Sequence, residues 1–228
     1  MNIIITGAGK GIGFELVKKF ASSGEHQIIA LARDISKLNP LLNTKSRIIP
    51  YTADICKVDF PEQLALFVTA KKFNIDILIN NAGLMVNKPA ESLSGNDFDN
   101  LFATNVKAPF LLIQSLLPYF SKPSHIVNLG SMGGFQGSAK FKGLSLYSAS
   151  TGALAILTEC LAEEFTEKGI RVNCLALGAV QTEMLESAFP GYKAPMNAVE
   201  AADYIADFSL NGHRYFNGKI IPVSSSTP

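Results

Sequence analysis

The sequence is poor in charge, and the charge it has is balanced. Only 17% of its 228 residues are Asp, Glu, Lys or Arg, and 20 basic against 19 acidic side chains leave a formal net charge of +1. No block of like charge occurs along the chain. A surface that attracts nucleic acid or an anionic membrane needs a concentration of basic residues. The composition therefore predicts neither nucleic acid nor a membrane as a partner.

Long apolar runs and clusters of metal-ligating residues are also missing. No apolar run approaches the roughly 18 residues that span a bilayer. The first residues lack the charged start and cleavage site of a signal peptide. Three cysteines lie far apart without a CxxC pair, and the three histidines are equally scattered, which argues against a disulfide framework and a zinc site. We expect a cytoplasmic protein without a bound metal.

Apolar residues are plentiful, at 47% of the chain. Such a chain can bury a large core, so intrinsic disorder is excluded. No linker, repeat or low-complexity stretch divides the sequence, and residues 1–228 are predicted to form one domain.

Short apolar runs alternate with longer segments of helical spacing. This alternation predicts parallel β-α-β units with right-handed crossovers, in one doubly wound α/β sheet of about seven strands with helices on both faces. The expected strands are Asn2–Thr6, Gln27–Ala32, Arg47–Pro50, Ile75–Asn80, His125–Leu129, Ile170–Ala176 and Lys219–Val223. The expected helices are Ile12–Ser22, Pro61–Phe73, Asp97–Tyr119 with a kink at Pro109, Leu146–Lys168 and Ala198–Phe208.

Four glycines, Gly7, Gly9, Gly11 and Gly13, fall between the first strand and the first helix. Glycine allows a tight turn and lets backbone N–H groups approach a pyrophosphate, and the helix N-terminus favours an anion. The spacing is Gly-x-x-x-Gly-x-Gly rather than the strict GxGxxG, and a tight strand-to-helix turn is the alternative interpretation. Its position after the first strand favours a nucleotide site.

The segment Thr6–Gly13, TGAGKGIG, resembles the cofactor loop of the short-chain dehydrogenase/reductase family. Further matching motifs follow in the family's order: Asp54, NNAG at Asn80–Gly83, Asn105, Ser131, Tyr147 and RVNCLALGAVQT at Arg171–Thr182. The similarity extends from the first strand to about Met184, and more loosely to Val223. It implies a Rossmann-type fold, a nicotinamide cofactor and oxidoreductase activity.

The end of the second strand bears on which nicotinamide cofactor is used. An acid there binds the ribose 2′-hydroxyl in dinucleotide folds, but this chain has Ala32 followed by Arg33. Arg33 can pair with a 2′-phosphate, and Lys10 in the glycine loop adds a second positive charge. These residues favour NADP(H), while Asp34 keeps NAD(H) as the alternative.

The resemblance also implies a set of cofactor contacts. It assigns Asp54 to the adenine edge, Asn81 with the Ala82–Gly83 backbone to the adenosine ribose, and Thr182 to the nicotinamide carboxamide. The full expected set is Thr6, Gly7, Gly9, Lys10, Gly11, Ile12, Gly13, Arg33, Asp54, Ile55, Asn81, Ala82, Gly83, Thr151, Gly178, Val180 and Thr182.

For catalysis, the resemblance assigns the substrate oxygen to Ser131, its proton to Tyr147 and support of a proton-relay water to Asn105. The family's Tyr-x-x-x-Lys, however, is here Tyr147 followed by Thr151 at the fourth position. Residues four apart share one helix face, and a nearby cation lowers a tyrosine pKa by roughly 1–3 units. Threonine carries no charge, so we expect slow turnover. Lys140 and Lys142 in the preceding loop are candidate substitutes.

The leading hypothesis is an oxidoreductase that transfers a hydride between NADP(H) and a small carbonyl or alcohol substrate. One alternative is a catalytically inactive NADP(H)-binding regulatory or scaffold protein. Another is a cofactor-independent lyase or dehalogenase on the same scaffold, against which the glycine loop argues. Residues 183–198 are the expected lid over the substrate. Helix Leu146–Lys168 is apolar on more than one face, which predicts a homodimer or homotetramer.

Overall fold

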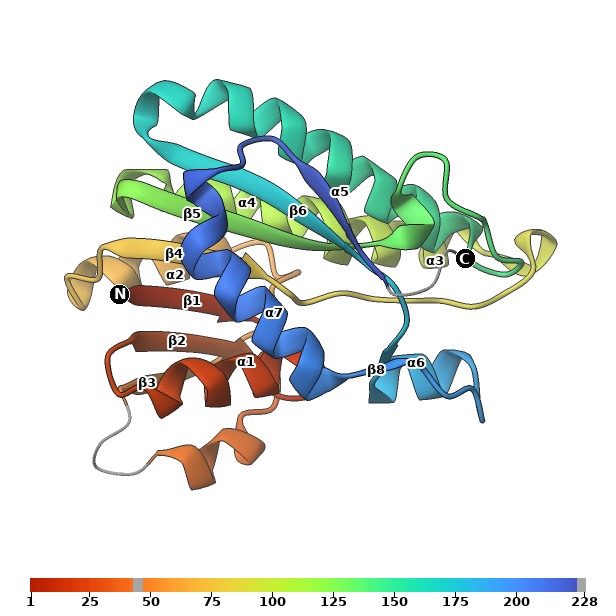
Figure 1. Cartoon of the computed structure of the whole chain (residues 1–228), viewed down its shortest axis with the longest axis horizontal. Coiled ribbons are helices and arrows are strands. Elements are labelled where there is room, and N and C mark those ends of the chain that lie inside the picture. The colour runs from red at the N-terminus through yellow and green to blue at the C-terminus, as the bar shows by residue number, and fades with distance from the viewer. Residues whose placement is uncertain (43–46, 225–228) are drawn as a thin grey trace.

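Seven parallel strands form the main sheet of the computed structural model, which describes residues 1–42 and 47–224 (Figure 1). This confirms the doubly wound α/β fold predicted from the sequence. The strands lie in the order β3 (Ile48–Thr52), β2 (Gln27–Ala32), β1 (Asn2–Thr6), β4 (Ile75–Asn80), β5 (Phe120–Ser131), β6 (Ile170–Leu177) and β9 (Ile220–Val223).

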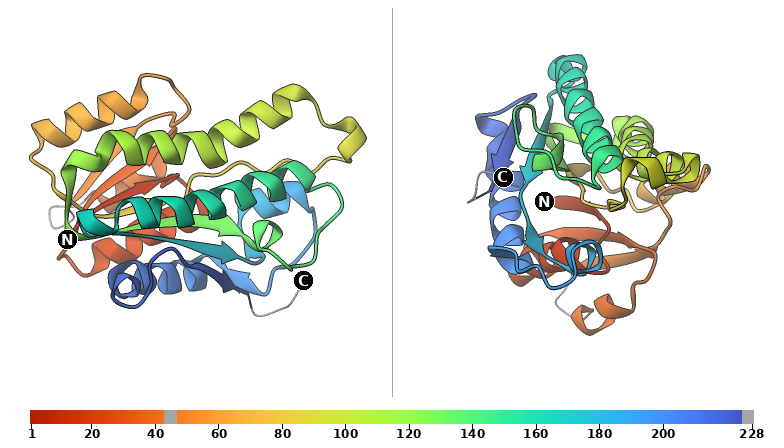
Figure 2. Two further views of the ribbon diagram at one scale, coloured as in Figure 1. Left: turned by 90° about the horizontal axis from the view of Figure 1, so that it is seen from above. Right: turned by 90° about the vertical axis from the view of Figure 1, so that its right-hand side faces the viewer.

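Helices cover both faces of the sheet (Figure 2). One face carries α1 (Gly11–Ser22) and α7 (Ala198–Asn211). The other carries α2 (Phe60–Ala70), α4 (Ala108–Leu116) and α5 (Ser145–Glu164). Because strands covered on both faces have no solvent-facing side, they are apolar throughout rather than alternating with polar residues.

Side chains of β1 show how one strand serves two cores. Ile3 and Ile5 belong to the cluster that contains Leu16 of α1 and Ile205 of α7. Ile4, between them, belongs to the cluster on the opposite face. Successive strand residues point to opposite faces, so a run of three isoleucines anchors both helical layers.

The expected long helix Asp97–Tyr119 is divided into several parts. It consists of α3 (Gly95–Phe102), a π-helical turn Ala103–Lys107, α4 and a 3-10 turn Leu117–Tyr119. The irregularity predicted at Pro109 lies immediately before that residue. Pro109 has no N–H to donate to the carbonyl of Asn105, four residues earlier. In the residue before it, the Ala108 N–H bonds the Ala103 carbonyl, five residues earlier, which is a π-type step.

Three short elements near the carboxyl-terminal end of the chain were not expected. These are β7 (Val180–Gln181), β8 (Met196–Asn197), which pairs with it in parallel, and α6 (Glu183–Ala188) between them. All three are too short for a periodic pattern to reveal. Together they fold the expected lid segment 183–198 back onto the domain.

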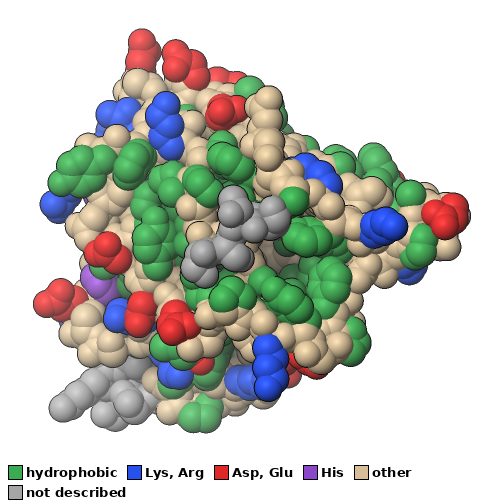
Figure 3. Space-filling view, turned by 45° about the vertical axis from the view of Figure 1, so that its right-hand side comes forward, with side chains coloured by type: hydrophobic (Ala, Val, Ile, Leu, Met, Phe, Trp, Pro, Cys, Tyr) green, Lys and Arg blue, Asp and Glu red, His purple; other side chains and the backbone are tan. Residues whose placement is uncertain are grey.

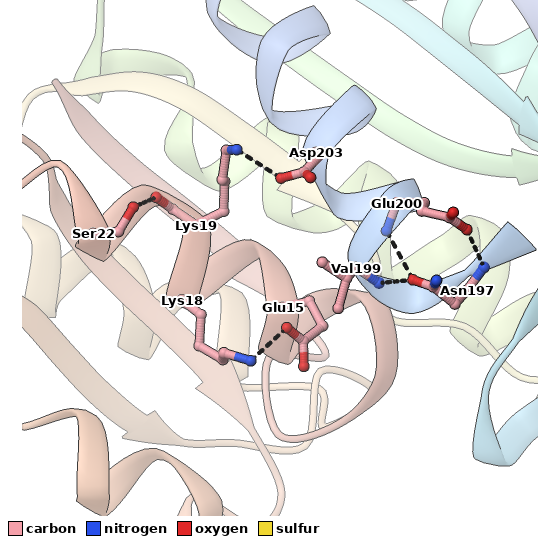
Figure 4. A network of polar contacts seen from close by, with 8 residues as sticks. All are labelled: Glu15, Lys18, Lys19, Ser22, Asn197, Val199, Glu200 and Asp203. Atoms are coloured by element: carbon pink, nitrogen blue, oxygen red, sulfur yellow. Dashed lines mark hydrogen bonds and ion pairs between the residues drawn. The ribbon is translucent and has the colours of Figure 1, made fainter.

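Polar contacts fix where α7 begins and how it meets α1 (Figure 4). Asn197 caps α7, its Oδ1 accepting from the N–H groups of Val199 at 2.9 Å and Glu200 at 3.0 Å. Glu200 Oε2 accepts from the Asn197 N–H at 2.9 Å, which completes a capping box. Lys19 of α1 pairs with Asp203 of α7 at 2.6 Å. The lid segment therefore ends at a defined point.

Within the described ranges, no helix is both long and apolar enough to cross a membrane. The same residues contain no group of three His, Cys, Asp or Glu side chains placed to hold a metal ion. Helix α5 does leave apolar surface exposed, since Ile156 is 61% exposed.

Leu16 is fully buried between α1 and the sheet, whereas Leu66 of α2 is 71% exposed. We expect Leu16→Ala to lower the free energy of unfolding by about 2–5 kcal/mol, because it leaves a cavity in the core. Leu66→Ala is the matched control and should change it by less than about 0.5 kcal/mol. Urea denaturation of both variants measures this, and equal losses would contradict the assigned core.

Candidate active site

The expected site residues gather at the carboxyl ends of the central strands, at the right of Figure 1. Thr6 ends β1, Asn80 ends β4 and Ser131 ends β5. In open α/β sheets, ligands bind at this edge, where the strand order reverses. Here the order reverses between β1 and β4, the two strands that the glycine loop and the NNAG motif follow.

The glycine loop needs glycine for two separate reasons. Gly7 and Gly11 have positive φ angles of 68° and 54°, which side chains other than glycine rarely adopt. Gly9 and Gly13 have no room for a side chain: a Cβ at Gly9 would lie 2.5 Å from the Asp34 carbonyl oxygen, and one at Gly13 would lie 2.3 Å from that of Gly7. The result is a narrow backbone turn that opens α1, a shape that fits a dinucleotide pyrophosphate.

Thr6 and Asn81 tie the glycine loop to the end of β4. Thr6 Oγ1 accepts hydrogen bonds from the backbone N–H groups of Asn81 and Ala82, each at 3.0 Å. Asn81 Nδ2 donates to the Thr6 carbonyl at 2.8 Å and to the Gly7 carbonyl at 3.2 Å. Both side chains therefore hold the loop, and their expected role at the cofactor site includes this support.

Charged residues lie at the end of β2. Arg33 is exposed, while Asp34 Oδ1 accepts from the Ser36 backbone N–H at 2.8 Å. That hydrogen bond is the main cause that lowers the Asp34 carboxyl pKa. Lys10 lies 3.2 Å from Glu183, the first residue of α6. Asp34 is thus engaged by the turn that follows it, and Lys10 by the lid segment.

Tyr147, on the first turn of α5, lies beside the side chain of Ser131, which ends β5. The Gly133 N–H donates to Ser131 Oγ at 3.1 Å and fixes the hydroxyl. Burial raises the pKa of the Tyr147 phenol, and the nearby Ser131 hydroxyl lowers it by less. The structure therefore brings together the serine and tyrosine that the sequence paired.

Thr151, four residues after Tyr147, bonds its own helix and carries no charge. Its side chain is buried, and Oγ1 donates to the backbone carbonyls of Tyr147 at 3.1 Å and Ser148 at 3.2 Å. Lys140 is held by its own loop, with Nζ donating to the Phe135 carbonyl at 2.8 Å and to Ser138 Oγ at 2.7 Å. The Lys140 ammonium is thus engaged by its own loop, and Lys142 is exposed.

Asn105 lies in the π-helical turn and is buried. Its Oδ1 accepts from the Leu84 N–H at 2.8 Å, and its Nδ2 donates to the Leu84 carbonyl and to Ser150 Oγ, both at 2.9 Å. Ser150 Oγ in turn donates to the Tyr147 carbonyl at 2.8 Å. Ser150, which links Asn105 to the helix that carries Tyr147, was not among the residues predicted from the sequence.

The remaining residues of the expected cofactor set either form local hydrogen bonds or pack against the hydrophobic cores. Thr182 caps α6, its Oγ1 accepting from the Leu185 N–H at 3.3 Å, and its methyl group lies beside Gly11. Gly178 N–H donates to the Val223 carbonyl at 2.9 Å, and Val180 is buried in β7.

Two isoleucines of the expected set, Ile12 and Ile55, pack against the two cores. Asp54 Oδ1 accepts from the Cys56 N–H at 3.0 Å, and Gly83 follows Ala82 at the end of β4.

Apolar side chains surround the carboxyl-end face, with charged groups toward its margin (Figure 3). Exposed large hydrophobic residues in the adjoining segments include Phe141, Met184 and Tyr192. Asn87 Nδ2 donates to the Ala188 carbonyl at 2.8 Å and joins the loop after β4 to the end of α6. The face therefore has an apolar rim of the kind that accepts a small organic ligand.

Comparison with known proteins indicates the family to which this chain belongs. A family model described as short chain dehydrogenase matches residues 1–193. The chain is 34% identical over 219 residues to an NADPH-dependent pterin aldehyde reductase of Arabidopsis thaliana, covering 91% of this chain and 88% of the relative. It is 28% identical over 207 residues to an uncharacterized oxidoreductase of Staphylococcus epidermidis, covering 89% and 87%.

Solved structures agree with this result. A 4-hydroxyisoleucine dehydrogenase complexed with NADH superimposes with a TM-score of 0.88 at 25% identity, covering 99% of this chain and 97% of that one. The chain belongs to the short-chain dehydrogenase/reductase family. Its curated relatives include proteins named as reductases and oxidoreductases.

The Thr6 hydroxyl is the acceptor for two backbone N–H groups. We expect Thr6→Val, which has nearly the same shape, to lower the free energy of unfolding by about 1–3 kcal/mol, because both donors lose their partner. Thr6→Ser keeps the oxygen and should retain most of the stability. Thermal and urea denaturation compare the three proteins, and a stable Thr6→Val variant would contradict the proposed tie.

Proposed function

We propose that this protein is an NADP(H)-dependent oxidoreductase acting on a small carbonyl or alcohol substrate, with slow turnover because Thr151 stands where the family has lysine. The observation that supports catalysis is that the Ser131 hydroxyl, at the end of β5, lies close enough to the Tyr147 phenol to lower its pKa. A hydroxyl pair at this position supplies both a proton donor and a hydrogen-bond donor for one substrate oxygen.

The cofactor proposal rests on the charged residues near the glycine loop. Lys10 and Arg33 supply positive charge, and Asp34 is engaged by Ser36. A phosphate on the adenosine ribose is recognised by such cations, whereas an acid aimed at the ribose would favour NAD(H). The plant relative is named as NADPH-dependent, and the structural neighbour holds NADH. The residues of this chain favour NADP(H).

In the reductive direction, Ser131 donates a hydrogen bond to the substrate carbonyl oxygen and Tyr147 donates the proton. The reduced nicotinamide, when bound, supplies the hydride. Asn105, buried in the π-helical turn and joined through Ser150 to the helix of Tyr147, supports resupply of the proton. A tyrosine whose pKa is raised is a weaker acid, and this explains the expected slow rate.

A second candidate is an NADP(H)-binding protein without catalysis. The observation that favours it is the environment of Tyr147, where burial raises the phenol pKa and the lysine position holds a threonine bonded to its own helix. The glycine loop and its supporting bonds would still bind the nucleotide. Binding with no turnover across a broad carbonyl panel would identify this second function.

The remaining parts of the proposal concern substrate and assembly. The exposed hydrophobic side chains of Phe141, Met184 and Tyr192, in segments next to the site, favour an apolar small molecule. The exposed Ile156 on α5 favours association of two or four copies through that helix. Size-exclusion chromatography with light scattering measures the assembly.

The first test is a calorimetric titration with NADPH beside NADH. We expect NADPH to bind more tightly, because the 2′-phosphate adds contacts that NADH cannot make. Arg33→Met should weaken NADPH by about tenfold, the loss of one charged hydrogen bond, and leave NADH unchanged. Failure of the wild type to bind either nucleotide would overturn both candidate functions.

Thr151→Lys tests the missing cation. We expect the pH at which alcohol oxidation reaches half its maximum to fall by roughly 1–3 units, because the ammonium stabilises the phenolate that accepts the proton. At a fixed pH below that midpoint, each unit by which the phenol pKa falls raises the phenolate fraction, and hence the rate, by about tenfold. Rates measured from pH 6 to pH 11 with a panel of small alcohols provide the profile.

Two further variants make the comparison specific. Thr151→Met has nearly the size of lysine without its charge, so its profile should remain like the wild type. Tyr147→Phe added to Thr151→Lys should remove the gain, because the group that titrates is gone. Equal profiles for Thr151→Lys and Thr151→Met would contradict the assigned role of Tyr147.

A further inference from the structure

Two lysines from distant segments converge on one carboxylate beside the glycine loop. Lys10 Nζ lies 3.2 Å from Glu183 Oε2, and Lys37 Nζ lies 3.0 Å from Glu183 Oε1. The hydrogen bond from Lys37, with that from Lys10, lowers the Glu183 carboxyl pKa. All three side chains are more than half exposed, so a ligand in solution can reach them. The pair already holds an anion, supplied by the protein itself.

The position of this cluster relates it to the end of β2. The Gly9 backbone approaches so closely that a Cβ there would lie 2.5 Å from the Asp34 carbonyl oxygen. Lys10, the next residue, therefore lies beside the turn that carries Arg33 and Lys37. Asp34 accepts the Ser36 N–H on that same turn. The lysine pair therefore lies near the turn that follows Arg33, where the cofactor proposal places an adenosine 2′-phosphate.

We propose that Lys37 joins Lys10 in binding the cofactor's 2′-phosphate and that Glu183 is an internal competitor for that site. A phosphate, like a carboxylate, presents several acceptor oxygens to converging ammonium groups. The phosphate must displace Glu183 from both lysines before it gains their full contact. Lys37 thereby determines preference for the phosphorylated cofactor, and Glu183 limits its affinity. This inference rests on the proposed function, because it requires NADP(H) binding.

The competitor also connects the cofactor to the lid segment. Glu183 is the first residue of α6, and Thr182 before it lies against Gly11 of the loop. Release of Glu183 frees α6 from Lys10 and Lys37 only when the phosphorylated cofactor is bound. NADH has no phosphate and leaves the contact in place.

Affinity measurements on single variants test this division of roles. Lys37→Met should weaken NADPH and adenosine 2′,5′-bisphosphate by about tenfold, the effect of losing one charged hydrogen bond. Glu183→Gln should tighten both by about two- to fivefold, the range of an exposed ion pair. NADH and adenosine 5′-monophosphate should bind all proteins equally. Lys18→Met removes a lysine that pairs with Glu15 on α1 and is the control for net charge.

The outcomes separate this inference from the proposed function. If the wild type binds NADPH tightly while Lys37→Met and Glu183→Gln leave its affinity unchanged, the Lys10–Lys37–Glu183 cluster is not the phosphate site, and the inference is overturned. If Glu183→Gln weakens NADPH, the carboxylate supports binding rather than competing, and the inference is again wrong. A wild type that binds neither nucleotide fails at the proposed function itself. If the wild type binds NADH more tightly than NADPH, the proposed choice of NADP(H) is wrong. The affinity of Lys37→Met for adenosine 2′,5′-bisphosphate still measures whether Lys37 binds a 2′-phosphate.

Discussion

Burial of the parallel sheet on both faces is the constraint on which the rest of the molecule depends. The isoleucines of β1 alternate between two helical layers, so neither face of the sheet is open to a ligand. Polar side chains that follow the strands can then meet only at the sheet's edges. Thr6, Asn81, Ser131 and their neighbours gather at the carboxyl edge for this reason, and the chemistry of the family is concentrated there.

The same edge holds the proposed catalytic pair, Tyr147 and Ser131, without the lysine that we expect to activate the tyrosine. The Tyr147 and Ser131 side chains remain neighbours, and the Asn105–Ser150 bond joins the π-helical turn to the tyrosine's helix. Thr151 satisfies its hydroxyl on backbone carbonyls and leaves no donor or charge toward the phenol. Geometry and electrostatics are therefore carried by different residues. The scaffold keeps the first without the second.

Much of the fold was predictable because its signals are local. All seven strands of the main sheet were found, although β5 begins five residues before its predicted start, and the predicted helix Asp97–Tyr119 is divided. The ordered motifs identified the family. The two-residue strands β7 and β8 were missed because periodicity needs length. The contacts of Lys37, Ser150 and Glu183 were missed for a different reason. They join segments far apart in the chain, and no spacing along the sequence encodes such meetings.

The bonds from Asn81 have a consequence for how a nucleotide is received. Its amide holds the Thr6 and Gly7 carbonyls, and Gly13 has no side chain to obstruct them. The loop is shaped by the protein's own contacts and not by a ligand. A pre-organised loop loses little conformational entropy when it becomes occupied, so more of the contact energy appears as affinity. The rigid glycine loop contrasts with the start of α6, where the exposed Glu183 is held by ion pairs that can rearrange.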